Sequence, residues 1–554
     1  MIILNNALKN FTAAEKAAKT STPQTKRTPG RTDEVKNNAG GYTFKVSPVD
    51  RLERFLILGT DGGTYYVGQN KLTADNAKFI RGLIQTDEAL VLERIVDVSV
   101  NARAYKNSPA LFALALVLTE GQNKAAARAA VSKVARTSTH LFEFASYLDD
   151  LGGWGRAKRN AIADWYTDKD TGALAYQAVK YRGGRNGWTH RDLMRKSHPK
   201  GIDKSVGNFI LGKESFGEHD ERIIGGFHLM QRAGSVKEVI SVLNEYKNLP
   251  WETIPTQFLS EPEVWKTLFR NGQLQGQALV RNITRLSRNG TFKDMMFAAE
   301  YAERLADEEM IRRTRLHPIN FLNAVVVHET GQADRSGGYW SWGRKKDWDT
   351  VPQIVDALNA GFHTSFKTVE PAGKRTMLAI DVSGSMSAPA MGLELSCAQV
   401  SAAMAMTVAR TEPAHIIRGF TSGSRGWAIR GGAQLTDLGI TANTGLSGAM
   451  DKVQKNNFGG TDCAQPMLWA LENDVEVDTF AILTDSETWS GSVKPSQALE
   501  KYRKATGIPA RLAVFGIAGT EFTIADSSDS GQMDFVGCDS NAPRVFADFS
   551  AGRI

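Results

Sequence analysis

The stretch Thr376-Met-Leu-Ala-Ile-Asp381-Val-Ser383-Gly-Ser385 places one carboxylate and two hydroxyls directly after an apolar run. An unbroken apolar run of this kind predicts a strand buried on both faces, as in a parallel sheet. Polar side chains that follow such a strand lie at the carboxyl edge of the sheet, where open α/β folds bind ligands. Oxygen ligands alone favour Mg²⁺, or another hard divalent cation, over Zn²⁺. The stretch therefore predicts an α/β domain with a magnesium site.

Two later segments supply the further oxygens that such a site needs. Gly459-Gly-Thr461-Asp462 opens a helix-like segment, and Phe480-Ala-Ile-Leu-Thr-Asp485 repeats the pattern of a strand followed by an acid. Together with the first stretch they resemble the metal-ion-dependent adhesion site of von Willebrand factor type A domains. The alternative is that Asp381 caps a helix and that the serines line a turn.

The preferences of the metal narrow the assignment of ligands. Mg²⁺ takes six oxygen ligands at about 2.1 Å and retains several waters. We predict that the hydroxyls of Ser383, Ser385 and Thr461 are direct ligands, and that Asp381 and Asp485 act mainly through bound water and the hydroxyls. The resemblance implies that an unfilled coordination position accepts an acidic side chain of a protein partner. A two-metal phosphodiesterase site would need more bridging carboxylates.

Predicted strands and helices alternate from residue 366 to the carboxyl terminus. Strands are predicted over 376–383, 415–420, 479–486 and 510–518, with helices near 392–410, 461–473, 495–505 and 543–550. This alternation favours a parallel, Rossmann-type sheet with helices on both faces. The segment 421–432 departs from it and predicts an edge hairpin and loop. We assign residues 366–554 to a von Willebrand factor A-like domain.

The preceding part of the chain is predicted to be helical. Apolar residues recur with a period of about 3.6 in the segments 76–84, 89–100, 109–119, 124–135, 139–148 and 156–166. Successive amphipathic helices without strands favour an α-solenoid of paired helices over residues 41–365. No fixed-period repeat is evident. Residues 1–40 are rich in Lys, Thr, Ala, Asn and Gly, and predict a flexible basic amino-terminal arm.

Charge is divided unevenly between these parts. From residue 366 onward 16 Lys and Arg oppose 20 Asp and Glu, a net charge of −4, whereas the preceding residues carry 51 against 40, a net charge of +11. An anionic partner, most often a nucleic acid, is therefore expected for the helical part only. The alternative is a basic surface that only keeps the protein soluble and has no specific partner.

The remaining composition indicates a cytoplasmic protein. The chain has three cysteines without metal-ligand spacing, which suits a reducing compartment. Its first residues lack the basic region and apolar core of a secretory signal. No apolar run reaches the roughly 18 to 20 residues of a membrane span, so we expect no membrane partner.

The densest basic stretch runs from Tyr176 to Lys200. Thr189, followed by Asp192 three positions later, predicts a capping box that begins a helix. On that helix Arg191, Arg195 and His198 share one face. The candidate RNA-binding residues are Lys180, Arg185, His190, Arg191, Arg195 and His198. The alternative is a solvated helix face without a partner.

Several long motifs resemble the Ro autoantigen, or TROVE-domain, family. They are Lys180-Tyr-Arg-Gly-Gly-Arg-Asn-Gly-Trp-Thr-His-Arg-Asp-Leu-Met-Arg-Lys-Ser-His198, Arg315-Leu-His-Pro318, Phe366-Lys-Thr-Val-Glu-Pro-Ala-Gly-Lys-Arg375, Gly459-Gly-Thr-Asp-Cys463 and Phe522-Thr-Ile-Ala-Asp526. The RNA-contacting Lys and Arg of that family match Lys180 and Arg185, and its Ser-His pair matches Ser197 and His198. This sequence has one extra residue between Lys180 and Arg185. His190, Arg191 and Arg195 come from the helix-face argument alone.

The resemblance implies both a fold and a function. Family members resemble one another in a ring of HEAT-like helical repeats closed by a von Willebrand factor A-like domain. They bind small noncoding Y RNAs on a basic outer surface, and they take single-stranded 3′ ends of misfolded or structured RNAs through the central hole. Bacterial relatives pass such RNAs to an exoribonuclease such as polynucleotide phosphorylase. The implied role is RNA quality control or degradation.

Motifs of catalysis are missing from the sequence. There is no His-Glu-x-x-His zinc motif and no Gly-x-Ser-x-Gly nucleophile elbow between a strand and a helix. We therefore expect a binding protein rather than an enzyme. A Mg²⁺-dependent protein-adhesion module on a helical scaffold is the alternative, and a metal-dependent nuclease is the third hypothesis.

Overall fold

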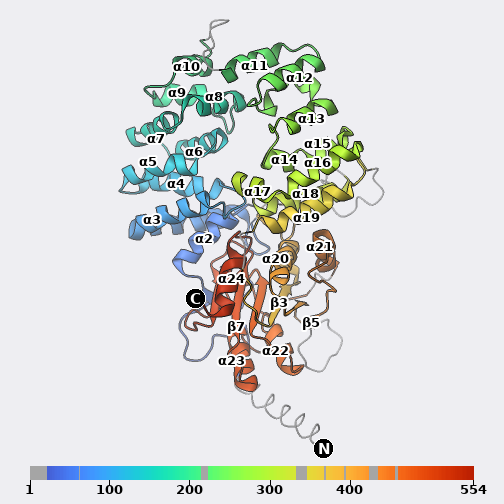
Figure 1. Ribbon diagram of the computed structural model, residues 1–554. Helices are drawn as coiled ribbons and strands as arrows, with labels where there is room; N and C mark the ends of the chain where they lie inside the picture. Colours follow the sequence, from blue (N-terminus) through green and yellow to red (C-terminus); the bar gives the residue numbers. More distant parts are fainter. Residues whose placement is uncertain are drawn as a thin grey trace, which may run out of the picture. The chain divides into compact units, whose positions relative to one another are not determined.

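The computed structural model describes residues 21–61, 63–213, 222–331, 346–366, 370–391, 393, 395–422, 435–455 and 459–554 (Figure 1). The chain forms two compact units. The first, here called the sheet unit, comprises residues up to Asn76 together with Phe366–Ile554. The second, the helical unit, comprises Ala77–Ser365. The mostly helical, repeat-like part and the α/β domain of the predicted fold class are therefore confirmed.

A six-stranded sheet forms the centre of the sheet unit, in the order β5-β4-β3-β6-β7-β9. All neighbouring strands are parallel except the edge pair of β4 and β5. The strands are β3 (Thr376–Asp381), β4 (His415–Phe420), β5 (Leu435–Thr436), β6 (Thr479–Thr484), β7 (Arg511–Gly516) and β9 (Gln532–Val536). Every residue of β3 and β6 is buried, as the apolar runs predicted. Strand β9 was not predicted, and most of the predicted edge hairpin lies outside the described residues.

Helices cover this sheet. They are α2 (Pro48–Leu58), α20 (Cys397–Thr411), α21 (Leu446–Lys455), α22 (Gln465–Glu472), α23 (Pro495–Thr506) and α24 (Ala542–Ala551). A capping box between Ser396 and Gln399 fixes the beginning of α20. Helix α2 packs against β9, and its buried Arg54 donates both hydrogen bonds of an ion pair to Asp534, at 2.6 and 2.7 Å.

The predicted flexible arm is wrong for residues 21–40; residues 1–20 lie outside the described part. Strands β1 (Glu34–Lys36) and β2 (Tyr42–Lys45) pair antiparallel, and β2 also pairs with β8 (Phe522–Thr523). Glu34 forms a buried ion pair with Lys494 at 2.9 Å. We call residues 21–66 the N-terminal strap. Composition suggested disorder because the partners that order this segment lie more than 400 positions away in the chain.

The helical unit is built from consecutive helices, as predicted. They are α3 (Gln69–Val100), which begins in the sheet unit, α4 (Ser108–Glu120), α5 (Lys124–Val134), α6 (Ser138–Asp150), α7 (Arg156–Thr167), α8 (Thr171–Lys180), α9 (His190–Ser197), α10 (Lys204–Leu211), α11 (Arg222–Arg232), α12 (Val236–Glu245), α13 (Pro262–Arg270), α14 (Gln277–Arg281), α15 (Ile283–Arg288), α16 (Met295–Ala306), α17 (Glu308–Thr314), α18 (Pro318–Thr330) and α19 (Pro352–Thr364). Helix α3 is kinked at Asp87, between the two segments predicted for it.

Neighbouring helices bury one core along the helical unit. Contacts join α4 to α6, α5 to α7, α12 to α13 and α16 to α19, around fully buried side chains such as Trp165, Trp265 and Tyr301. The two ends of the array also meet, because Nε2 of His317 lies 3.1 Å from the carbonyl oxygen of Arg103. Within the described ranges no helix has the length and apolar character needed to cross a membrane.

Candidate metal centre and cation ridge

Two buried carboxylates stand at the carboxyl ends of adjacent strands. Asp381 ends β3 and is fully buried; its Oδ1 accepts from the Ser383 amide at 2.9 Å and its Oδ2 from the Thr484 hydroxyl at 2.6 Å. Asp485 follows β6, and its Oδ1 accepts from the Glu487 amide at 3.0 Å. Ser385 and Asp485 line the same small cavity. Because β3 and β6 are paired in parallel register, the two acids emerge on the same edge.

Three hydroxyls converge beside these acids. The Oγ atoms of Ser383 and Ser385 lie 3.2 Å apart, and the Thr461 hydroxyl donates to Ser383 Oγ at 2.9 Å. The amide of Gly384 donates to the Gly459 carbonyl at 3.0 Å, which joins the two loops that carry the hydroxyls. The structure thus brings together all five residues that the sequence singled out for metal binding.

The electrostatics of this cluster favour a cation. Burial, and then the charge of Asp485, raises the pKa of Asp381, and burial raises the pKa of Asp485. Among the described groups that shift these two pKa values, none is a lysine or arginine. A divalent cation at the hydroxyls would relieve the repulsion between the acids and lower both pKa values.

The donor set suits a hard ion. Within the described ranges no cluster of three or more His, Cys, Asp or Glu side chains has metal-binding geometry, so the hydroxyls would have to provide the direct ligands. Mg²⁺ accepts such oxygens and keeps water in its remaining positions. Asp462 is committed elsewhere, since it accepts from the side chains of Gln24 at 2.6 Å and Gln465 at 2.8 Å. When bound, the ion would supply a positive charge that holds an anionic oxygen.

Sequence reasoning missed the residues around the mouth of this site. A cleft of about 420 Å³ beside Ser385 and Thr461 is lined by Tyr65, Tyr66 and Trp489. The tyrosines belong to the glycine-rich stretch 59–66, which lacks the Lys-Ser/Thr pair of a phosphate-binding loop and contains no other recognisable motif. Their partners come from the other end of the chain, so the local sequence carried no signal.

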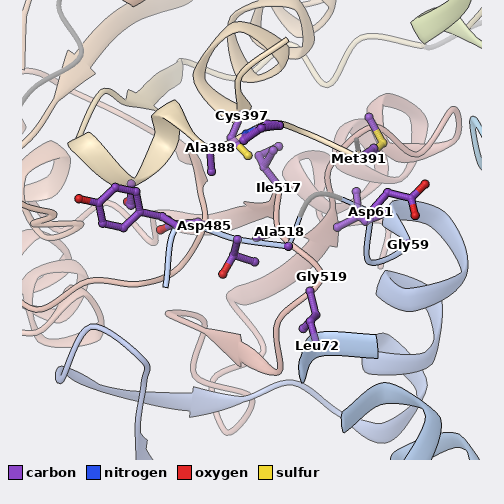
Figure 2. Close-up of a pocket in the computed structure, with 16 residues that line it drawn as sticks. Gly59, Asp61, Leu72, Ala388, Met391, Cys397, Asp485, Ile517, Ala518 and Gly519 are labelled. Atoms are coloured by element: carbon purple, nitrogen blue, oxygen red, sulfur yellow. The ribbon is translucent and has the colours of Figure 1, made fainter. Parts of the chain in front are cut away.

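A second, smaller cavity adjoins the cluster at Ser385 and Asp485. It measures about 20 Å³, which is room for about one water molecule. Figure 2 shows Asp485, Ala388 and Cys397 on its wall, with Asp61 and Gly519 nearby. Burial and the charges of the two acids raise the pKa of the Cys397 thiol, so this thiol remains neutral.

The helical unit carries a group of exposed cations. Arg191 and Arg195 lie on α9, His198 ends that helix in the left-handed conformation, and Arg185 precedes it. The predicted capping box between Thr189 and Asp192 is present. Arg185, Arg191 and Arg195 form no ion pair with any carboxylate in the described part of the chain. We call Arg185, Arg191, Arg195 and His198 the cation ridge.

Two of the predicted RNA-binding residues do not belong to this ridge. His190 is buried, with Nδ1 2.9 Å from the Tyr166 hydroxyl and Nε2 2.8 Å from the Ser138 hydroxyl. Burial lowers its pKa to about 3, so it is a neutral core residue and the prediction of an RNA contact is wrong for it. Lys180 is half-buried: its ammonium lies 3.6 Å from Glu252 and over the ring of Tyr176. The helix-face argument failed for His190 because this residue, the first of α9, packs against Tyr166 and Ser138 of preceding helices.

Comparison with family models identifies both units. Residues 375–550 match the Ro60 vWA domain. Residues 35–221 and 246–336 match the TROVE domain. The second match begins within the N-terminal strap, so strap and helices are parts of one family pattern.

Known proteins resemble the chain over nearly its whole length. It is 39% identical to the RNA-binding protein RO60 of Deinococcus radiodurans, across 96% of this chain and 98% of that protein. It is 31% identical to the RNA-binding protein RO60 of Caenorhabditis elegans, across 96% and 92% respectively. The crystal structure of the Deinococcus radiodurans RO (RSR) protein matches with a TM-score of 0.64 and 37% identity, over 92% of this chain and all of that one. The chain therefore belongs to the Ro60 family, with a TROVE domain joined to a Ro60 vWA domain.

Proposed function

We propose that this protein binds RNA through the cation ridge. The carrying observation is that three arginines are exposed together without carboxylate partners in the described part of the chain. Cations that no acid neutralises are available to phosphates, and neutralising phosphates releases counterions and drives RNA binding. The relatives are named for RNA binding, which supports the same function.

The geometry of the ridge suits a structured RNA. A capped helix holds Arg191 and Arg195 one turn apart, and Arg185 is held in a tight turn in which its amide donates to the Trp188 carbonyl at 2.8 Å. Cations at fixed spacing favour an RNA whose phosphates are also fixed, such as a folded small RNA. We therefore propose a Y-type small noncoding RNA as the ridge's ligand.

We further propose a role in RNA quality control. In this role the helical ring would take single-stranded 3′ ends of misfolded or structured RNAs and pass them to an exoribonuclease such as polynucleotide phosphorylase. The meeting of the array's two ends at Arg103 and His317 supports a ring. The three free, buried cysteines are consistent with the reducing cytoplasm that we propose as its location.

Salt-dependent RNA binding tests the ridge. The variant Arg185→Gln/Arg191→Gln/Arg195→Gln should lower the slope of log affinity against log salt by about 3, since each neutralised phosphate contributes about 0.9. The RNA should be whatever copurifies with the wild-type protein, identified by sequencing. The matched control is Arg81→Gln/Arg128→Gln/Arg270→Gln, which removes as many cations from the helical unit, all of them paired with acids. Equal losses in the two triple variants would contradict a role specific to the ridge.

A second candidate function rests on the metal centre. We propose that it captures an acidic side chain of a protein partner through Mg²⁺ or a similar ion. Three converged hydroxyls beside two buried acids support this proposal, and a single ion without bridging carboxylates suits adhesion better than hydrolysis. Degradation of RNA by purified protein with Mg²⁺, abolished in Thr461→Val, would instead favour a nuclease.

A further inference from the structure

We propose that Tyr66 and Trp489 are the hydrogen-bond donors that receive a carboxylate at the metal centre. The inference rests on the second proposed function and names the residues of this chain that recognise the captured group. The phenol O–H and the indole N–H would bind the carboxylate oxygen that the ion leaves unbound. The ligand class is an acidic side chain displayed on a protein.

Tyr66 stands directly at the predicted ligands. Its side chain lines the cleft together with Ser385, a predicted metal ligand, and Trp489. The cleft at this point is lined by the same residues together with Gly460 and Thr461. The phenol of a tyrosine is protonated at neutral pH, so Tyr66 can donate a hydrogen bond. A group entering the cleft toward the hydroxyls therefore passes both donors.

The position of Trp489 is fixed by tight packing. A Cβ atom on Gly460 would lie 2.8 Å from Cζ2 of the indole, so only glycine allows the ring to lie there. The amide of Trp489 donates to the Thr461 carbonyl at 3.2 Å. The indole is thus tied to the loop that carries a predicted metal ligand, although 38% of the residue remains exposed.

The N-terminal strap holds the same loop from the other side. The side chain of Asn37 donates to the Thr488 carbonyl at 2.8 Å, and a Cβ atom on Gly41 would lie 1.9 Å from that carbonyl. The Glu487 carboxylate accepts from the Asn38 side chain at 2.6 Å and from the Ala39 amide at 3.1 Å. Donors held in place before binding lose little entropy when a ligand arrives. The strap therefore builds one wall of the proposed receptor.

The chemistry of a carboxylate fits these donors. A carboxylate has two oxygens, and a cation that takes one of them leaves the other to be satisfied in a partly dry cleft. Hydrogen bonds to charged groups contribute more than those between neutral groups. The exposed rings of Tyr65 and Trp489 flank the cleft and limit the access of water. The carboxyl groups of Asp381 and Asp485 already lie beside the three hydroxyls, so capture of a further carboxylate requires the cation and the donors together.

Isothermal titration calorimetry of the full-length protein tests this inference. Mn²⁺ serves as the metal probe, followed by a capped Gly-Glu-Gly peptide, a capped Gly-Gln-Gly peptide and free glutarate. Tyr66→Phe should weaken binding of the glutamate peptide about tenfold, within the range for a hydrogen bond to a charged group, and leave Mn²⁺ affinity unchanged. Tyr147→Phe, which removes a phenol hydroxyl from the helical unit, is the matched control and should change neither. Trp489→Phe, which retains a ring but loses the N–H, should act in the same direction as Tyr66→Phe.

The possible outcomes distinguish failure of this inference from failure of the proposed metal centre. If the wild-type protein takes up no Mn²⁺, the metal centre itself is wrong. If Mn²⁺ binds but Tyr66→Phe leaves peptide affinity unchanged or raises it, the metal centre stands and the donor role is overturned. If Tyr66→Phe weakens the binding of Mn²⁺ and of the peptide equally, Tyr66 only supports the loops that carry Ser383, Ser385 and Thr461. That result would also overturn the inference. Tighter binding of free glutarate than of the peptide would overturn the assignment to a displayed side chain.

Discussion

Polar groups are arranged in opposite ways in two regions of the molecule. One is the pair of loops in the sheet unit that carry Ser383, Ser385 and Thr461, here called the metal loops, and the other is the cation ridge of the helical unit. The predicted ligands of the metal loops are buried and hydrogen-bonded within the protein, as for Asp381 with Ser383 and Thr484. On the ridge the arginines are exposed and have no acidic partner within the described residues. The first arrangement selects a small ligand of fixed geometry, whereas the second suits a large anion that brings its own structure. Buried polar groups are therefore expected to affect stability, and ridge groups to affect binding alone.

The largest expected effect comes from a buried ion pair of the sheet unit. Arg54→Ala leaves Asp534 buried without its partner, and should destabilise the protein by about 3–5 kcal/mol, the range for such losses. The exposed pair of Arg81 and Glu120 in the helical unit provides the contrast, because Arg81→Ala should cost about 0–1 kcal/mol. Urea denaturation measures both. If both variants lost similar free energy of unfolding, buried and exposed polar groups would not differ in their effect on stability.

Metal binding should stabilise the sheet unit next most strongly. At a Mg²⁺ or Mn²⁺ concentration of 100 times Kd, linkage predicts a gain of about 2.7 kcal/mol. Ser383→Ala should abolish the gain, while Ser387→Ala should preserve it, because that hydroxyl is exposed and donates to the Gly384 carbonyl in the same loop. Thermal unfolding with and without metal is the measurement. A gain that survives in Ser383→Ala would place the ion elsewhere.

Acid should act on the helical unit through its buried histidines. Burial lowers the pKa of His190 from 6.5 to about 3. A lowered pKa means that the unfolded chain binds the proton first, so stability is lost as pH falls from about 6.5 toward 3, by up to about 1.4 kcal/mol per pH unit. His190→Gln should reduce the slope of stability against pH by the contribution of one titrating group. Tyr166→Phe disturbs the same cluster but keeps the histidine, and should leave the slope intact; hydrogen exchange at several pH values reports it.

The same pH range should affect the metal-free sheet unit in the opposite direction. Burial, and then the charge of Asp485, raises the pKa of Glu487 to about 7. A raised carboxyl pKa favours the folded state at low pH, and that contribution disappears as pH rises from about 4.3 through 7. Opposite pH trends in the two units, measured in the same hydrogen-exchange experiment, would sharpen the contrast between them.

The smallest expected effect concerns Lys180. The family resemblance predicted an RNA contact, but its ammonium is half-buried beside Glu252 and Tyr176. Lys180→Gln should therefore weaken RNA binding less than Arg185→Gln, which removes an exposed cation. Binding of the copurified RNA at one salt concentration compares the two variants. A larger loss for Lys180 would show that RNA displaces Glu252 from this ammonium.

Features that depend on neighbouring residues could be predicted from the sequence. The apolar runs before Asp381 and Asp485 predicted buried parallel strands, and the acids at their ends lie together because parallel strands share one carboxyl edge. Helical spacing predicted the array of helices, and the break expected near residue 87 coincides with the kink of α3. The spacing of apolar residues and the residue types at the ends of strands are local properties, so they can be recognised in a single sequence.

Contacts between residues far apart in the sequence could be identified only in the folded chain. The N-terminal strap looked disordered because its partners, among them Lys494 and Asp526, are encoded far away. His190 looked like a surface cation until the fold buried it against Tyr166. The proposed donors, Tyr66 and Trp489, lie more than 400 positions apart in the sequence and line one cleft only in the folded chain. Burial and long-range contact are set by packing, which composition and periodicity do not record.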